Sequence, residues 1–444
     1  MVPLLVRMSV PSVAAQMVNL LYNIVDRIYI GHIPGIGTDA LAGIGVCSIV
    51  IILVAACAQF TGGGGTPLAA IELGRGNIHA AEKILGNGTT LLLILSGLLM
   101  LLVFGFERPV LILCGASDAT LPYAMEYLSV YMLGTVFVMI SAGLNPFINC
   151  QGRALIAMLS VLIGAALNIV LDPVFIFVLH MGVRGAAVAT VLSQFVSAAW
   201  ILIYLMKRTT RLRIRAGCMK PEAKVLKPVL ALGVSPFIMA GTESLTGLVL
   251  NHGLAVYGDI HVSTLTVMQT AMQLVGTPLQ GFAQGCSPVI SFNYGRGDGA
   301  RVREANRIQL IIMFSFNFAI TLFMILMPGT VAGIFTEDPV LIGEVRRVMP
   351  VFMSGMLIFG LQRSCQNTFV AFDEAKISIF IALLRKMILL IPLALVLPCW
   401  FREMGVFYAE PIADVISAVT CTLLFALRMP AILRRLEEKQ QDGK

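Results

Sequence analysis

The segment ILGNGTTLLLILSGLLMLLVFGF, residues 84–106, contains no charged side chain. A helix needs about 20 mainly apolar residues to cross the hydrocarbon core of a bilayer, and this segment meets that requirement. The rest of the chain resembles it, because hydrophobic residues make up 58% of the 444 residues and charged residues only 12%. Soluble domains carry roughly 45–50% apolar residues and about 25% charged residues. The composition therefore excludes a water-soluble enzyme, a disordered chain, a coiled coil and a fibrous protein.

Breaks at charged, glycine-rich and proline-rich positions divide the chain into apolar segments long enough to cross a membrane. The first carries polar residues and lacks a convincing cleavage site, so it is predicted to be a helix and not a signal peptide. We expect an all-α integral membrane protein with twelve transmembrane helices, at 9–30, 41–73, 84–106, 120–147, 154–179, 184–206, 229–257, 262–290, 305–327, 340–371, 375–398 and 405–428.

The 31 Lys and Arg residues indicate how these helices are oriented. With twelve spans, 22 of them fall on the side of the termini and 5 on the opposite side, and the other four lie within or at the ends of spans. Basic residues collect in cytoplasmic loops, so both termini and the loop 207–228 are predicted to be cytoplasmic. The same rule explains the net charge of +7 without a nucleic-acid partner. Nine scattered cysteines and five dispersed histidines indicate neither a disulfide framework nor a metal centre.

The chain also contains an internal repeat. Pro67-Leu-Ala-Ala followed by Gly74-Arg75-Gly76 matches Pro288-Val-Ile-Ser followed by Gly295-Arg296-Gly297, 221 residues later. Phe147–Gly152 matches Phe369–Glu374 more loosely. Two six-helix bundles of the same orientation are typical of transporters with parallel repeats and suit alternating access. The predicted parts are an N-lobe (1–206), a basic linker (207–228), a C-lobe (229–433) and a charged tail (434–444).

Polar residues within the spans of the N-lobe are candidates for function. A carboxylate inside a bilayer is costly unless it is paired, protonated or turned to a polar cavity. Asp26 and Asp172 are of this kind, and Asn168 lies one helical turn before Asp172. Asn168, Asp172 and Thr190 offer only oxygen-rich groups, which suit Na⁺, while a partly desolvated carboxylate suits a proton. Pro11 predicts a hinge in the first helix or simply its start.

The C-lobe offers two sets of charged residues. Glu243 and Arg363 are expected to interact, as a structural pair or with a direct role in transport. Glu410 and Asp414 lie one turn apart and are candidates for a proton relay. Neutralisation of these two acids by Arg385 or Lys386 is the alternative. No enzyme motif occurs. The run Gly62–Gly65 is not followed by the Lys-Ser/Thr pair that ends a phosphate-binding loop, so it favours close helix packing. Energy must then come from an ion gradient, with no cofactor.

Four stretches, LYNIVDRIYIGH (21–32), GLNPF (143–147), LNIVLDP (167–173) and AEPIAD (409–414), resemble the multidrug and toxic compound extrusion (MATE) family. The resemblance covers nearly the whole chain and is closest to the bacterial MepA- and DinF-like branch. It implies a monomeric protein of the bacterial cell membrane that exports cationic or lipophilic small molecules against Na⁺ or H⁺. It also implies a cation site at Asp26, Asn168, Asp172 and Thr190, a helix-one kink at Pro11, and supporting residues Tyr22, Asn145 and Gln194.

The resemblance leaves two points open. Glu243 matches an acidic residue of the NorM branch, but Arg363 aligns with that residue's acidic partner, so a NorM-type ion site in the C-lobe is doubtful. The wider superfamily also contains lipid-linked saccharide flippases, whose cavities need several basic residues for a diphosphate. Such a flippase, or an exporter of one metabolite, is the alternative to drug export.

Overall fold

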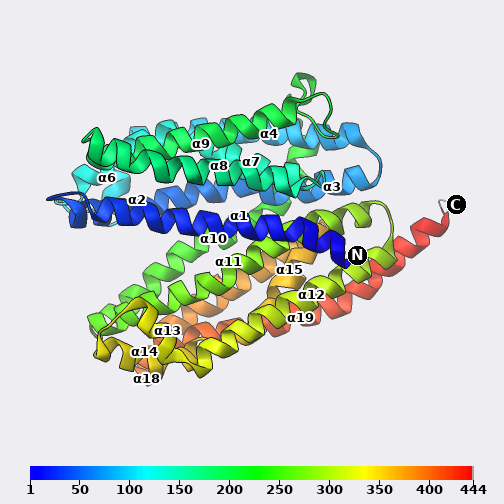
Figure 1. Ribbon diagram of the computed structural model, residues 1–444. Helices are drawn as coiled ribbons and strands as arrows, with labels where there is room; N and C mark the ends of the chain where they lie inside the picture. The colour runs from blue at the N-terminus through cyan, green and yellow to red at the C-terminus, as the bar shows by residue number, and fades with distance from the viewer. Residues whose placement is uncertain (443–444) are drawn as a thin grey trace. The chain divides into compact units, whose positions relative to one another are not determined.

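The computed structural model describes the backbone of residues 1–442 and the side chains of residues 1–438 except position 244. All regular secondary structure in this part of the chain is helical, which confirms the all-α class (Figure 1). The end of the predicted charged tail, residues 443–444, lies outside the described residues.

The helices of the first half include two π-helical segments, η1 and η2. They are α1 (Val2–Gly31), α2 (Gly37–Gln59), η1 (Phe60–Gly65), α3 (Thr66–Gly74), α4 (Ile78–Gly105), α5 (Glu107–Leu113), α6 (Leu121–Leu133), α7 (Thr135–Asn149), α8 (Ala154–Pro173), η2 (Val174–Val178) and α9 (Gly182–Met206). A short 3₁₀ turn, η3 (Ala216–Cys218), lies in the predicted linker.

The second half follows the same pattern of long and interrupted helices. Its elements are α10 (Ala223–Ala255), α11 (Asp259–Gly295), α12 (Gly299–Leu326), α13 (Pro328–Phe335), α14 (Pro339–Phe352), η4 (Gly355–Ile358), α15 (Phe359–Ala371), α16 (Ala375–Leu383), η5 (Leu384–Leu390), α17 (Ile391–Val396), α18 (Pro398–Phe401) and α19 (Glu403–Asp442).

The membrane-spanning class is confirmed by the length and apolar character of these helices. In the described residues nine helices qualify as candidate spans, and two bent pairs, α6 with α7 and α14 with Gly355–Ala371, raise the number to eleven. Helix α11 has 37 residues and is long enough to span, although it is not among these candidate spans. Each of the twelve predicted spans overlaps one of these helices or interrupted helices.

The internal repeat is visible in matching local structure. Gly76 and Gly297 end α3 and α11 with φ of 80° and 79°. The following residue then caps the next helix: the Asn77 side chain accepts from Ala80 N at 3.1 Å, and the Asp298 side chain accepts from Arg301 N at 3.0 Å. Positive φ strongly favours glycine at such helix ends. The match therefore records a turn and a cap that both halves use.

The looser match near residue 150 needs a correction of one residue. Gly152 and Asp373, which are 221 positions apart, both take positive φ, 77° and 63°. The backbone bonds that close the two turns, from Arg153 N to Ile148 O and from Glu374 N to Phe369 O, are also 221 residues apart. Phe369 thus corresponds to Ile148 and not to Phe147. Residue letters alone misplaced this match because the turn, not the side chains, is what the halves share.

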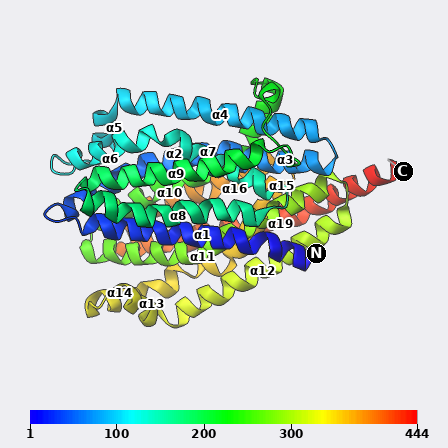
Figure 2. The same cartoon turned by 45° about the horizontal axis from the view of Figure 1, so that its top comes forward.

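The chain packs as two compact units. The N-terminal unit comprises Val10–Ala240, and the C-terminal unit comprises Met1–Ser9 with Gly241–Lys444. Both unit boundaries fall inside continuous helices, α1 and α10. Within the N-terminal unit, α8 and α9 lie side by side in both views (Figures 1 and 2). Residues 207–222 also pack in this unit, so the segment predicted as a linker is part of its folded structure.

The glycine run Gly62–Gly65 lets the backbones of η1 and α10 meet inside the N-terminal unit. A Cβ on Gly64 would lie 2.2 Å from Val229 O, and a Cβ on Gly233 would lie 2.6 Å from the Cα of Phe60. Small residues are what allow such close approach of membrane helices, and the predicted role of this run in packing agrees with these distances.

We expect Gly64→Ala to destabilise the protein by about 1–3 kcal/mol, the usual cost of overpacking, because the added methyl meets a backbone carbonyl. Gly97→Ala is the matched control, since a Cβ there meets nothing within 4 Å. Alanine favours the helix over glycine by about 1 kcal/mol, so this control should be neutral or slightly stabilising. Thermal unfolding of the purified variants in detergent measures both. Equal unfolding temperatures for the two variants would contradict the packing argument.

Candidate functional site

The two predicted carboxylates of the N-terminal unit meet in the structure. Asp26 comes from α1 and Asp172 from the last turn of α8, and their carboxyl groups lie within hydrogen-bonding range of each other. Asp172 is fully buried. Arg27 is exposed, and no ion pair joins it to Asp26 among the described residues. Two carboxylates this close in a buried site cannot both stay charged unless a cation lies between them. Otherwise one of them must take up a proton.

The amide of Asn168 organises this pair. Its Nδ2 donates to Asp172 Oδ1 at 3.2 Å and to Thr190 Oγ1 on α9 at 3.5 Å. Three oxygen atoms are nevertheless buried and receive no hydrogen bond from a described donor: Asp26 Oδ1, Asn168 Oδ1 and Asp172 Oδ2. Buried polar atoms normally have a partner, so this concentration of acceptors requires explanation. A bound cation or proton would satisfy it, and the donor set consists only of oxygens.

Two tyrosines of α6 belong to this site, and the sequence analysis missed them. Tyr127 is 3% exposed, and its hydroxyl lies within hydrogen-bonding range of Thr190. Its ring stacks on Tyr131, with 6.0 Å between the ring centroids. The only sequence signal was their spacing of one helical turn within an apolar span, which packing aromatics share.

The supporting residues predicted for the N-lobe occupy different surroundings. Tyr22 is half-buried and lies close enough to Asp26 to interact with it electrostatically. Asn145 instead joins α7 to the first half of α8, donating to Ala157 O at 2.9 Å and to Ser160 Oγ at 2.7 Å. Gln194 is half-buried on α9, one turn after Thr190. Of the three, Tyr22 is therefore the one that the structure brings to the carboxylates.

The carboxylates of the C-terminal unit are paired with basic residues. Arg385 donates from Nε to Asp414 Oδ1 at 2.6 Å and from Nη2 to Glu410 Oε1 at 3.4 Å. Lys386 donates to Glu410 Oε1 at 3.2 Å, and the guanidinium of Arg385 lies over the ring of Phe359. The structure thus contains the neutralising pairs that the sequence left open beside a proton relay.

The predicted pair of Glu243 and Arg363 is not a close ion pair. Arg363 lies within electrostatic range of both Glu243 and Arg385. No salt bridge within 4.0 Å joins Glu243 to Arg363 in the described part of the chain. Glu243 is exposed although it lies in the middle of α10. A carboxylate at that depth faces water or polar groups and not lipid, so it is available to other charges.

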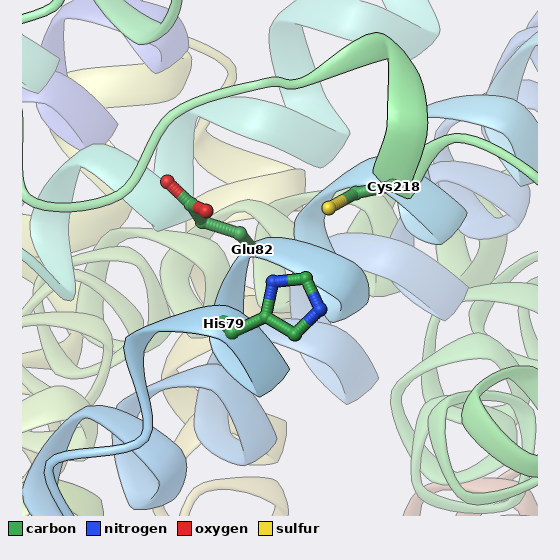
Figure 3. Close-up of side chains that lie close together, drawn as sticks. All are labelled: His79, Glu82 and Cys218. Atoms are coloured by element: carbon green, nitrogen blue, oxygen red, sulfur yellow. The ribbon is translucent and has the colours of Figure 1, made fainter.

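A third group of side chains has the composition of a metal centre. His79 and Glu82 of α4 and Cys218 of η3 place potential ligand atoms within 4.8 Å of one another (Figure 3). The Glu82 carboxylate, however, already pairs with Arg215 Nε at 2.7 Å and with Arg213 Nε at 3.6 Å. Two guanidinium groups on one carboxylate oppose the binding of a metal cation, so we assign Glu82 to the docking of the 207–222 segment.

Comparison with known proteins gives a consistent result. The sequence profile of the MatE family matches residues 11–174 and 237–396. The chain is 24% identical over 423 residues to the multidrug export protein MepA of Staphylococcus haemolyticus, covering 95% of this chain and 92% of that protein. A crystal structure of MATE in the bent conformation superposes with a TM-score of 0.91 at 25% identity, covering 98% and 96% of the two chains. The structure of an outward-facing multidrug resistance MATE transporter superposes with a TM-score of 0.89 at 24% identity, covering 97% of this chain and 96% of that one.

We expect Asp414→Asn to lower stability by about 3 kcal/mol, because Arg385 is then left buried with only part of its compensating charge. Glu403→Gln is the control: its pair with the exposed Arg347 is a surface contact worth less than about 1 kcal/mol. The double substitution Arg385→Met with Asp414→Leu should recover most of the loss, since apolar side chains need no counter-charge. Thermal unfolding of the purified variants measures these changes in stability, and an unchanged midpoint in Asp414→Asn would contradict the pairing.

Proposed function

The chain belongs to the MatE family of transporters, and from this premise we propose that it exports lipophilic, cationic compounds by antiport against H⁺ or Na⁺. The observation that carries the proposal is the Asp26–Asp172 pair with its three buried acceptor oxygens. A positive charge would satisfy these oxygens, and both a coupling ion and a cationic compound provide one. Competition for the same acidic site is the simplest physical basis for exchange, because occupation by one cation expels the other.

The multi-pass membrane location follows from the family and the helices. We extend it with the charge distribution, which favours cytoplasmic placement of both termini. Export from the cytoplasm then requires the N-terminal site to open alternately to each side. Proline lacks the N–H that an α-helix needs, so α1 is weakest around Pro11. The boundary between the compact units falls between Ser9 and Val10 in the same helix. We propose that cation binding at Asp26 bends α1 at this point.

The charges of the C-terminal unit argue against a lipid-linked saccharide flippase. A diphosphate needs several basic groups that are free to bind it. Arg385 and Lys386 are already engaged by Asp414 and Glu410, and Arg363 interacts with Glu243. Two of these three basic residues are therefore paired with acids of the same unit, and the third lies within electrostatic range of one.

We expect Asp172→Asn to abolish gradient-driven export. Ethidium efflux from energised vesicles, measured under imposed Na⁺ and pH gradients, should fall to background, because even an outer-shell partner of a bound ion contributes roughly 10- to 100-fold in affinity and Asp172 would hold the ion directly. The gradient that drives the wild type identifies the coupling ion. Asp39→Asn, an exposed acid at the start of α2, is the control and should transport normally. Wild-type rates in Asp172→Asn under both gradients would refute the coupling site.

We expect Pro11→Ala to slow transport while substrate binding is retained. Alanine favours a continuous helix over proline by about 3 kcal/mol, so the bent form of α1 becomes less populated. Pro3→Ala is the control, because proline in the first turn of the same helix removes no helical hydrogen bond. Efflux rates and ethidium binding by fluorescence separate the two effects. A normal efflux rate in Pro11→Ala would show that the helix does not act as a hinge there.

A further inference from the structure

Residues 207–222, here called the strap, are fixed to the N-terminal unit by buried polar side chains of α4. Glu82 is 2% exposed and holds both Arg213 and Arg215. Asn87 is fully buried, donates to Cys218 O at 3.1 Å and accepts from Glu222 N at 2.7 Å. Buried polar groups whose hydrogen bonds and charges are all satisfied favour a single arrangement of the chain. The strap is therefore held in one position.

Backbone contacts extend this attachment along the strap. Thr90 Oγ1 donates to Met219 O at 2.6 Å, and the Leu212 N–H donates to Gln151 Oε1 at 3.1 Å. A Cβ on Gly86 would lie 2.5 Å from Cys218 O, so the strap lies directly on the α4 backbone there. Leu212 is fully buried. Since these anchors use the strap's backbone and apolar residues, most of its basic side chains are left to point outward.

Six basic residues in and beside the strap are exposed and have no ion pair among the described residues. Of the eight Lys and Arg residues between positions 207 and 227, only Arg213 and Arg215 are paired with a carboxylate. The other six are Lys207, Arg208, Arg211, Lys220, Lys224 and Lys227. Eight cations in 21 positions exceed what two nearby acids, Glu82 and Glu222, can compensate, so the surface carries a strong positive charge.

The end of α9 fixes the depth of three of these cations. Trp200 is 38% exposed, and Ile203 and Met206, 60% and 65% exposed, continue an apolar outer surface to the end of the helix. Exposed tryptophan is typical of the membrane interface. With a rise of 1.5 Å per residue, the end of α9 at Met206 lies about 9 Å beyond Trp200 along the helix axis, and Lys207 and Arg208 follow directly, at the outer edge of the lipid headgroups. Arg211 follows, held in place by the buried Leu212 next to it.

We propose that Lys207, Arg208 and Arg211 form a binding site for the headgroup of an anionic phospholipid. The exposed apolar residues at the end of α9 place acyl chains beside it, and the three cations carry the charge opposite to that of the headgroup phosphate. Juxtamembrane basic residues each contribute to such binding, and the anchored strap lowers the entropy lost when they converge on one phosphate. This site is separate from the carboxylates of the transport proposal and stands whether or not drug export is found.

The test uses the full-length protein in neutral detergent, titrated with fluorescent phosphatidylglycerol and, separately, phosphatidylcholine. The wild type should bind phosphatidylglycerol more tightly. The triple variant Lys207→Gln, Arg208→Gln, Arg211→Gln should lose roughly five-fold in affinity for each cation removed. The matched control removes the same charge at the opposite ends of spans, with Arg108→Gln, Arg184→Gln and Arg402→Gln, and should change the affinity less than about two-fold. Thermal unfolding in phosphatidylcholine confirms that each variant is folded.

Three results would overturn the proposal. Equal phosphatidylglycerol affinity in the wild type and the folded triple variant would leave these cations with a role in membrane orientation only. Displacement of the lipid by millimolar inorganic phosphate would indicate a site for free phosphate. Tighter binding of a short single-stranded oligonucleotide than of phosphatidylglycerol, lost in the same variant, would indicate nucleic acid. Selective loss of phosphatidylglycerol binding, with none of these, supports the lipid site.

Discussion

A carboxylate within a membrane must obtain a positive charge or a proton, and this requirement separates the two units of the chain. In the C-terminal unit the charge is built in, because Arg385 and Lys386 hold Asp414 and Glu410. In the N-terminal unit no described basic residue pairs with Asp26 or Asp172. One buried oxygen of each carboxylate receives no hydrogen bond from a described donor. Halves that share the same turns and caps thus differ in charge pairing, with these buried acids held by basic residues in one unit and joined to none by a described salt bridge in the other.

The same requirement explains why the N-terminal site is surrounded by hydroxyl and amide groups. Asn168 and Thr190 orient Asp172 without neutralising it, and Tyr127 covers Thr190. A nearby arginine would instead have neutralised the acids permanently, as Arg385 does in the C-terminal unit. Groups that orient but carry no charge keep the site reactive. This is a general device of ion sites, in which outer groups hold the ligands in position.

Much of this organisation could be predicted from the sequence because it follows from local patterns. Apolar length identified the spans, and carboxylates in apolar surroundings identified Asp26 and Asp172. The spacing of Asn168 and Asp172 predicted that they share a helix face. Tyr127 escaped notice because a buried aromatic in a span is usually only packing. The docking of residues 207–222 escaped for another reason: Glu82 meets Arg213 and Arg215 across more than 130 positions of sequence, and a charged loop gives no local sign of its acceptor.

The attachment of residues 207–222 to α4 also determines how the two units are connected. A free segment of that length would behave as a loose tether with an end-to-end distance of about 20–25 Å. Because it is folded down, the covalent connections that remain are α1 and α10, each a continuous helix across a unit boundary. A helix transmits torsion and bending where a tether transmits neither. Twist or bend in the backbones of α1 and α10 is therefore passed along the chain directly across each unit boundary.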